Sequence, residues 1–131
     1  MPKFSAISRQ RLETCHEDLQ RLFREVVKYV DCSILEGHRG RERQEQMVAE
    51  GKSKVHWPGG KHNTEPSNAV DVAPYPIDWE DIRRWYYFGG YVQATAQQMG
   101  IPVRWGGDWK GDHDFSANKF NDLPHWERIE A

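Results

Sequence analysis

The chain has 131 residues, a length that suits one domain with its own hydrophobic core. Hydrophobic residues make up 37% of the chain and aromatic residues 12%, which is too much apolar material for a disordered protein. The 18 basic and 20 acidic residues give a formal charge of -2, and this near-neutral balance argues against a general binder of nucleic acids or anionic membranes.

The cysteines and the N-terminus indicate where such a chain is made. Cys15 and Cys32 are too few for a disulfide framework and lack zinc-finger spacing, so the sequence suits synthesis in a reducing cytoplasm. Residues 1–10 contain no apolar signal-peptide core, and no segment approaches the ~20 apolar residues of a membrane span. A substrate outside the cytoplasm would therefore require another protein to release this one.

The first half of the chain predicts a helix, a strand, a second helix and a loop. Apolar side chains at steps of three and four predict one long helix after a Ser8 N-cap; they are Leu12, Cys15, Leu19, Leu22, Phe23, Val26, Val27 and Val30. Residues 32–35 are typical of a short strand. Residues 42–50 predict a polar helix that ends before Gly51, and the composition of 51–68 predicts a loop.

A strand and a long helix follow. Residues 69–73 alternate as a strand does, and the prolines after them end it. A helix is predicted from about Asp78 or Trp79 to Met99, with Asp78 as N-cap and Gly100 at its end. Gly89-Gly90 weakens this helix, which suggests that the helix packs closely on a sheet there.

The C-terminal third predicts two strands around a loop. Residues 101–105 and 125–129 have strand patterns, and the segment 106–121 is rich in Gly and Asp. Helices and strands are mixed without regular βαβ alternation. We therefore expect a single α+β domain over residues 1–131, with a small, mainly antiparallel central sheet and helices packed on one side.

Two segments place histidine and aspartate near predicted strand ends. His62, Asp71 and His125 make a set of two imidazoles and one carboxylate, which suits a catalytic zinc ion with one position left for water. Zinc lowers the pKa of its water toward ~7, and a nearby carboxylate can then move the proton. Asp122, three residues before His125, is the candidate for that role. The spacing alone also fits histidines and aspartates that bind no metal.

Four segments in order resemble the motifs of one enzyme family. They are the string HNTEPSNAVDVAP over 62–74, the string NDLPHWE over 121–127, the turn EGHR over 36–39 and the string WGGDW over 105–109. The first two resemble the metal motifs of zinc peptidases that cut D-amino-acid bonds in peptidoglycan. This family contains D-alanyl-D-alanine carboxypeptidases and dipeptidases, as well as phage and bacillar L-alanyl-D-glutamate endopeptidases. The last string resembles the phage endolysin branch.

The resemblance implies a role for each matching residue. His62, Asp71 and His125 match the zinc ligands, and Asp122 matches the catalytic acid/base. Arg39 matches the arginine that binds the scissile carbonyl and stabilises the oxyanion, a role that suits a permanently charged, forked donor. The implied fold is α+β with a central antiparallel sheet, as in hedgehog-like and DD-peptidase domains.

The chain departs from the family pattern in its first motif. Gly60 stands where the family commonly has serine, and nine residues separate His62 from Asp71 where many members have seven. We expect the extra residues to bulge in the loop before Asp71, which makes Asp71 the ligand most affected if they do not. Ser67 is the candidate to replace the absent serine.

These observations predict a zinc endopeptidase acting on peptidoglycan stem peptides, with the L-alanyl-D-glutamate bond as first choice. We expect a monomeric phage endolysin that is made in the host cytoplasm and reaches the cell wall after holin release. The alternatives are a D-alanyl-D-alanine carboxypeptidase, a non-catalytic wall-binding module, and a nuclease suggested only by His62-Asn63. The near-neutral charge argues against the nuclease.

Other polar and aromatic residues allow two interpretations each. The loop acids and histidine either bind calcium, offer a rival zinc ligand or cap turns; they are Asp108, Asp112, His113 and Asp114. The aromatic side chains of the long helix either stack on sugars or pack in the core; they are Trp85, Tyr86, Tyr87, Phe88 and Tyr91. Glu127 either orients a ligand imidazole or lies on the rim. His16 and His38 are expected to be bystanders, whereas His56 lies in a loop that could border the substrate.

Overall fold

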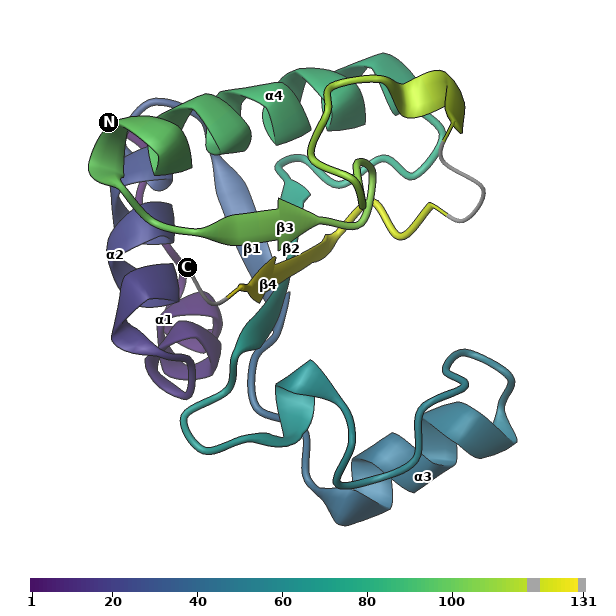
Figure 1. The fold of residues 1–131 in the computed structure, drawn as a ribbon. Coiled ribbons are helices and arrows are strands. Elements are labelled where there is room, and N and C mark those ends of the chain that lie inside the picture. Colours follow the sequence, from purple (N-terminus) through teal and green to yellow (C-terminus); the bar gives the residue numbers. More distant parts are fainter. Residues whose placement is uncertain (118–120, 130–131) are drawn as a thin grey trace.

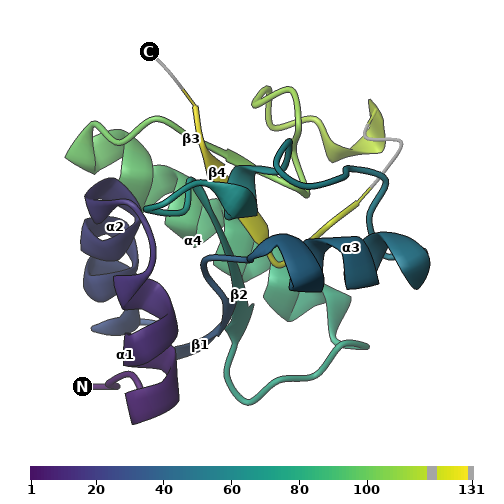
Figure 2. The ribbon, with the colours of Figure 1, turned by 90° about the horizontal axis from the view of Figure 1, so that it is seen from below.

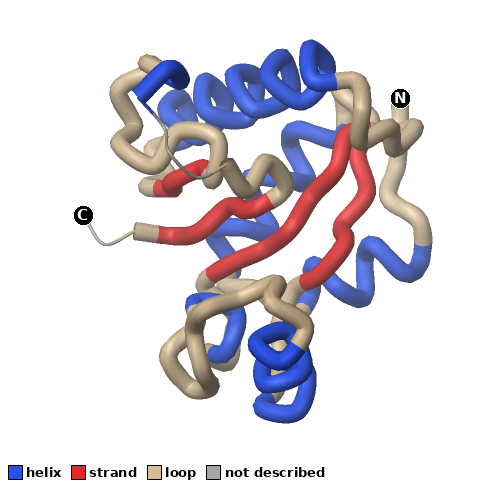
Figure 3. Tube along the Cα trace, turned by 90° about the vertical axis from the view of Figure 1, so that its right-hand side faces the viewer, coloured by secondary structure: helices blue, strands red, loops and turns tan. Residues whose placement is uncertain are grey.

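A computed structural model of the chain describes residues 1–117 and 121–129, and its centre is an antiparallel sheet (Figures 1 and 3). The four strands lie in the order β1-β2-β4-β3; they are β1 (Cys32–Glu36), β2 (Ala69–Pro74), β3 (Val103–Trp105) and β4 (His125–Arg128). All three pairings are antiparallel. The two central strands, β2 and β4, are therefore neighbours although they are far apart in the sequence.

Helices pack on one face of this sheet, which confirms the predicted α+β class. The covering helices are α1 (Ala6–Glu13), α2 (Glu17–Val27) and α4 (Ile82–Met99), whereas α3 (Arg41–Ala49) lies in a lobe beyond one end of the sheet (Figures 1 and 2). That lobe also holds a short 3-10 helix, Lys61–Asn63; a second one spans Phe115–Ala117. No described helix combines the length and apolarity needed to cross a bilayer.

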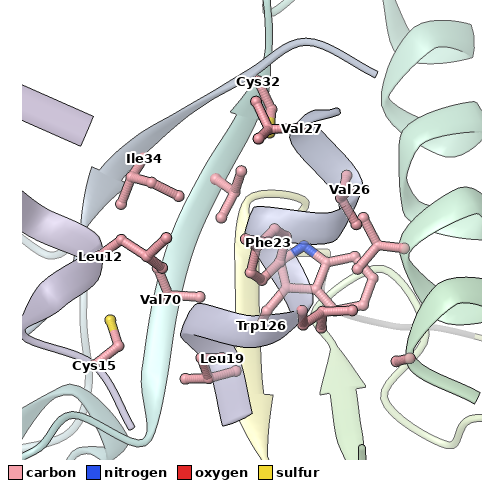
Figure 4. Close-up of a cluster of buried hydrophobic side chains, with 14 of the residues drawn as sticks. Leu12, Cys15, Leu19, Phe23, Val26, Val27, Cys32, Ile34, Val70 and Trp126 are labelled. Atoms are coloured by element: carbon pink, nitrogen blue, oxygen red, sulfur yellow. The ribbon is translucent and has the colours of Figure 1, made fainter. Parts of the chain in front are cut away.

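The hydrophobic core fills the space between the covering helices and the sheet (Figure 4). Val70 and Val72 point into it from β2, and both are fully buried. Trp126 of β4 stacks on Trp105 of β3 with 5.5 Å between ring centroids and meets Phe23 of α2 edge-on at 6.1 Å. Burial of each such side chain is worth ~1.5–3 kcal/mol, so the core holds β4 in its pairing with β2 and β3.

The N-terminal helical pattern forms two helices, not the single one predicted. α1 begins after Ser5, whose Oγ accepts the N–H of Ser8 at 3.1 Å, so Ser8 is not the N-cap. The helical conformation is interrupted at Cys15, which forms a parallel β-bridge with Ser67. The N–H of the next residue, His16, donates to the Ser67 carbonyl at 2.8 Å. Both helices turn their apolar sides to one core, so the periodicity continues through the break.

α4 begins later than the sequence predicts. Its N-cap is Asp81, whose carboxylate accepts the N–H of Arg84 at 3.3 Å. Asp78 instead caps the preceding turn, because its carboxylate accepts the N–H of Glu80 at 3.0 Å. The predicted end is confirmed: Gly100 follows the helix with a φ of 69°, a left-handed conformation that favours glycine.

Most of the aromatic group on α4 serves the core, as the core-packing interpretation predicts. Trp85 and Phe88 are each 1% exposed, and Tyr86 and Tyr91 are partly buried against the cluster. Only Tyr87 of this group is largely exposed, at 64%.

The two adjacent glycines of α4 have different surroundings. Gly89 is buried against the ring of Trp105, and a Cβ built on it would lie 2.3 Å from that ring. Gly90 is exposed, and a Cβ built on it would meet nothing within 4 Å. The predicted close packing of helix on sheet is therefore real and involves Gly89 alone.

The two glycines make a matched pair for a stability measurement. We expect Gly89→Ala to lower the free energy of unfolding by about 1–3 kcal/mol, because the added methyl group must displace the buried Trp105 ring. Gly90→Ala should raise it by about 0.5–1 kcal/mol, because alanine favours the helix and clashes with nothing. Urea unfolding of both variants measures the difference, and two changes of the same sign would contradict the packing described.

Candidate metal centre

Strand pairing brings two predicted ligands together on the face of the sheet that the covering helices leave open. Asp71 of β2 and His125 of β4 are direct partners in the antiparallel register. Their neighbours Val70 and Trp126 are buried in the core, so alternation along each strand directs Asp71 and His125 to the opposite face. His62 reaches the same place from the 3-10 helix Lys61–Asn63.

The three side chains meet with the spacing of a metal-binding group. Oδ1 of Asp71 lies 3.3 Å from Nε2 of His62 and 3.5 Å from Nδ1 of His125. One potential ligand atom from each residue lies within 4.8 Å of the other two, and no other trio of His, Cys, Asp or Glu in the described chain does so. Tetrahedral coordination with bonds of ~2.0–2.1 Å separates ligand atoms by about 3.3–3.4 Å. The two separations from Oδ1 of Asp71 match this distance closely.

Two buried atoms of this group lack hydrogen-bond partners. Nε2 of His62 and Oδ1 of Asp71 are inaccessible to solvent and make no hydrogen bond within the described part of the protein. Leaving a buried polar atom unsatisfied costs about 1–3 kcal/mol, so such atoms are rare and need an explanation. Both atoms face the centre of the group, and a cation bound there would satisfy both. The residues present therefore fit a metal ion.

Each imidazole is held by the nitrogen that does not face Asp71. Nδ1 of His62 lies 2.8 Å from the carbonyl oxygen of Gly37 and donates to it, which leaves the Nε2 lone pair free. Nε2 of His125 lies 2.8 Å from Oε1 of Glu127, so Nδ1 is the free nitrogen in that ring. The two rings thus present different nitrogens to one point, and the contacts of their other nitrogens favour the tautomers that metal binding requires.

Without a bound cation, the group is a strongly coupled cluster of charges. Burial opposes ionisation of Asp71, but the neighbouring imidazoles of His125 and His62 outweigh it and hold the pKa of Asp71 well below its usual range. Burial also opposes the charge on His125, yet Asp71 and Glu127 raise the pKa of His125 to about 9. Despite burial, His125 and Arg104 lower the pKa of Glu127 to about 2. A metal ion would replace the proton on His125 as the partner of Asp71.

Arg39 lies beside the group, inside a buried polar network. Its side chain is 7% exposed and donates from Nε to Glu36 at 2.9 Å and from Nη1 to Gln44 at 3.1 Å. Nη2 donates to Glu36 and lies 3.7 Å from Oδ2 of Asp71. Gln44 on α3 also accepts a hydrogen bond from Asn63 at 3.1 Å. This network ties helix α3 to the segment that carries His62, within the same lobe, and holds the guanidinium in one orientation.

Asp122 stands in the turn that leads into β4. Its N–H donates to the Gly106 carbonyl at 3.0 Å, and its own carbonyl accepts the N–H of His125 at 3.0 Å. A Cβ built on Gly106 would lie 2.0 Å from the Asp122 carbonyl oxygen, so only glycine allows this approach. Burial and the negative charge of Asp71 raise the pKa of Asp122, while the cationic side chains of the site oppose the shift. Its carboxyl therefore shares the electrostatic environment of the metal-binding group.

The acidic loop after β3 uses its carboxylates as caps. Asp108 is 2% exposed, and its Oδ2 accepts hydrogen bonds from Gln93 at 3.0 Å and from the N–H of His113 at 3.1 Å. Asp112 accepts the N–H of Asp114 at 3.0 Å. His113 does not join the metal-binding group of the described residues. The turn-capping interpretation is thus confirmed for these contacts, and calcium binding stays a prediction.

The departures from the family motif leave Asp71 in place. A Cβ built on Gly60 would lie 2.7 Å from Oδ1 of Asn63, which accepts the Gly60 N–H at 2.8 Å, so the glycine suits this turn. Ser67 lies outside the metal-binding group. Its Oγ donates to the Ala69 carbonyl at 2.6 Å and bends the chain into β2.

The three other histidines named from the sequence, His16, His38 and His56, also lie outside the group. His16 caps α2, His38 lies 3.2 Å from Glu65, and His56 lies 2.8 Å from Glu45.

Two residues of the site were not predicted from the sequence. Gln44 is 1% exposed and supports Arg39, but a single glutamine in a polar helix gives no periodic signal. Arg104 donates from Nη2 to Oε2 of Glu127 at 2.9 Å. The alternation of the terminal strand places Glu127 on the face of His125, so its role in orienting that imidazole was one of two predicted interpretations, and the structure supports it.

Known proteins resemble this chain in both sequence and fold. A sequence model of the family described as phage L-alanyl-D-glutamate peptidase matches residues 1–129. The L-alanyl-D-glutamate peptidase of Escherichia phage T5 is 30% identical over 119 residues, which are 86% of this chain and 85% of that protein. The crystal structure of the Serratia marcescens L-Ala D-Glu endopeptidase ChiX is similar with a TM-score of 0.77 and 31% identity, over 97% of this chain and 90% of that one.

Metal binding should stabilise the fold, with zinc as the probe ion. At a free zinc concentration 100 times Kd, we expect the free energy of unfolding to rise by about 2.7 kcal/mol, because the unfolded chain lacks the assembled site. Asp71→Asn should remove most of this gain, whereas His113→Ala in the acidic loop should keep it. Thermal unfolding with zinc and with a chelator measures both, and a loss in His113→Ala alone would place the ion in the loop.

Proposed function

The chain belongs to the phage L-alanyl-D-glutamate peptidase family, and from this membership we propose that it is a zinc peptidase that hydrolyses the L-alanyl-D-glutamate bond of peptidoglycan stem peptides. The single observation that carries the proposal is the meeting of His62, Asp71 and His125 at one point. The proposal treats residues 1–131 as one peptidase domain.

Zinc is the ion that this donor set favours. Two imidazole nitrogens and one carboxylate oxygen suit a borderline-soft cation, and three protein ligands are typical of a catalytic site with an open position. When bound, such an ion supplies Lewis acidity and makes water nucleophilic at neutral pH. His62, Asp71 and His125 would hold it.

Asp122 is the proposed general acid/base. Hydrolysis adds a hydroxyl group to the L-alanyl carbonyl carbon and a proton to the nitrogen of D-glutamate, so one proton must move from water to the leaving amine. The raised pKa of Asp122 suits a carboxyl that alternately takes and gives that proton. Its backbone hydrogen bonds to Gly106 and His125 keep it close to the place where the substrate would lie.

Arg39 is the proposed binder of the scissile carbonyl oxygen. The described hydrogen bonds to Glu36 and Gln44 use three of its five N–H groups, and Nη2 also lies 3.7 Å from Oδ2 of Asp71, so Nη1 keeps one N–H that the substrate could use. Because these contacts fix the guanidinium in advance, no reorganisation is needed as negative charge develops on the oxygen. Fixed donors of this kind typically contribute 10²–10³-fold to the rate.

The proposed setting follows from the substrate. Peptidoglycan lies outside the cytoplasm, and we propose that the protein acts on the wall as a monomeric endolysin after a holin opens the inner membrane. A D-alanyl-D-alanine carboxypeptidase would share the same chemistry but release a different product.

Digestion of purified sacculi tests the cleaved bond. We expect peptides with a new N-terminal D-glutamate, found by mass spectrometry, and none when a chelator is present. Free D-alanine without new D-glutamate termini would contradict the proposed bond and indicate a carboxypeptidase. Binding to sacculi with no cleavage would indicate a wall-binding module.

Asp122→Asn tests the proton-transfer role. We expect the rate of sacculus digestion to fall by ~10²–10⁴-fold, because an amide cannot carry the proton, while zinc affinity stays near the wild-type value. Asp112→Asn, which removes an acidic group from the exposed loop, is the matched control and should keep full activity. Undiminished digestion by Asp122→Asn would assign the proton transfer to another group.

A further inference from the structure

The two imidazoles of the metal-binding group are supported by unlike partners. His62 donates to a neutral backbone carbonyl, that of Gly37, whereas His125 donates to the carboxylate of Glu127. A carboxylate polarises an imidazole more than a carbonyl does, and this makes the free nitrogen of the ring a stronger ligand. His125 is therefore the histidine whose affinity for a metal depends on a second side chain.

Glu127 is placed for this role by the strand itself. It follows His125 by two residues on β4, so both side chains lie on the same face of the sheet. Its side chain is 8% exposed, and its two oxygens have separate partners: Oε1 faces Nε2 of His125 at 2.8 Å, and Oε2 accepts from Arg104 at 2.9 Å. With both oxygens engaged, the carboxylate cannot rotate away from the imidazole.

Arg104 connects the edge strand β3 to the metal-binding group through Glu127. It lies on β3 directly opposite Glu127 in the antiparallel register, and its side chain is 42% exposed. The guanidinium thus balances the buried charge of Glu127 while reaching solvent itself. A buried carboxylate that lost this partner would be poorly compensated and freer to move.

We propose that Glu127 and Arg104 form a positioning pair for His125, which fixes its tautomer and ring orientation and thereby sets the affinity of the site for its metal ion. Neither residue belongs to the metal-binding group of the described residues, so both would act through His125. The inference rests on the proposed metal site, but its test does not require peptidase activity.

Zinc affinity, measured by competition with a chromophoric chelator, is the direct readout. We expect Glu127→Gln to bind zinc about 10–100-fold more weakly than the wild type, because glutamine keeps the shape of the side chain and loses its charge. Arg104→Gln should weaken binding by a smaller factor, and Arg104→Lys should restore part of that loss because it keeps the charge. Arg128→Gln is the matched control, because Arg128 also lies on β4 but forms its ion pair with Asp18. The zinc affinity of this variant should stay within twofold of the wild-type value.

A second measurement separates positioning from general destabilisation. Thermal unfolding of the metal-free variants reports whether each one folds. If Glu127→Gln does not fold, the comparison of Arg104→Gln with Arg104→Lys tests the inference instead. Equal zinc affinity in wild type and in folded Glu127→Gln would overturn the inference and leave the proposed function intact. A wild-type protein without zinc affinity would overturn both.

Discussion

The site depends on one strand pairing, that of β2 with β4, which sets Asp71 opposite His125. Side chains alternate between the two faces of a sheet, so a slip of one residue in this register would turn Asp71 into the core and Val70 toward the site. The register is held from the other face, where Trp126 is fully buried between Trp105 and Phe23. The hydrophobic core and the metal-binding group therefore lie on opposite faces of the same strand pair.

The other residues of the site come from two segments that adjoin the sheet, the α3 lobe and the loop after β3. The α3 lobe supplies His62 and, through Gln44 and Asn63, a buried frame for Arg39. The loop after β3 supplies Gly106, whose lack of a side chain lets the turn with Asp122 pass close to it. The two central strands carry Asp71 and His125, and the segments around them carry the other residues of the site, whose positions depend on the sheet and its aromatic core.

The sequence allows the class of fold and the central residues of the site to be predicted, for physical reasons. The alternation around Asp71 and His125 indicates strands, and two imidazoles with one carboxylate indicate a metal. It does not predict the break at Cys15, because that break is made by a backbone bridge to distant Ser67. The role of Gln44 cannot be predicted for the same reason. Its burial and its contact with Arg39 depend on the tertiary structure and leave no periodic pattern in the sequence.

The central claim is that three side chains bind one ion, and anomalous X-ray diffraction from crystals grown with zinc tests it most directly. The account predicts a single strong peak at the zinc absorption edge, about 2.0–2.1 Å from Nε2 of His62, Nδ1 of His125 and a carboxylate oxygen of Asp71. A peak over the acidic loop at Asp112 and Asp114, with none between the two imidazoles, would contradict it.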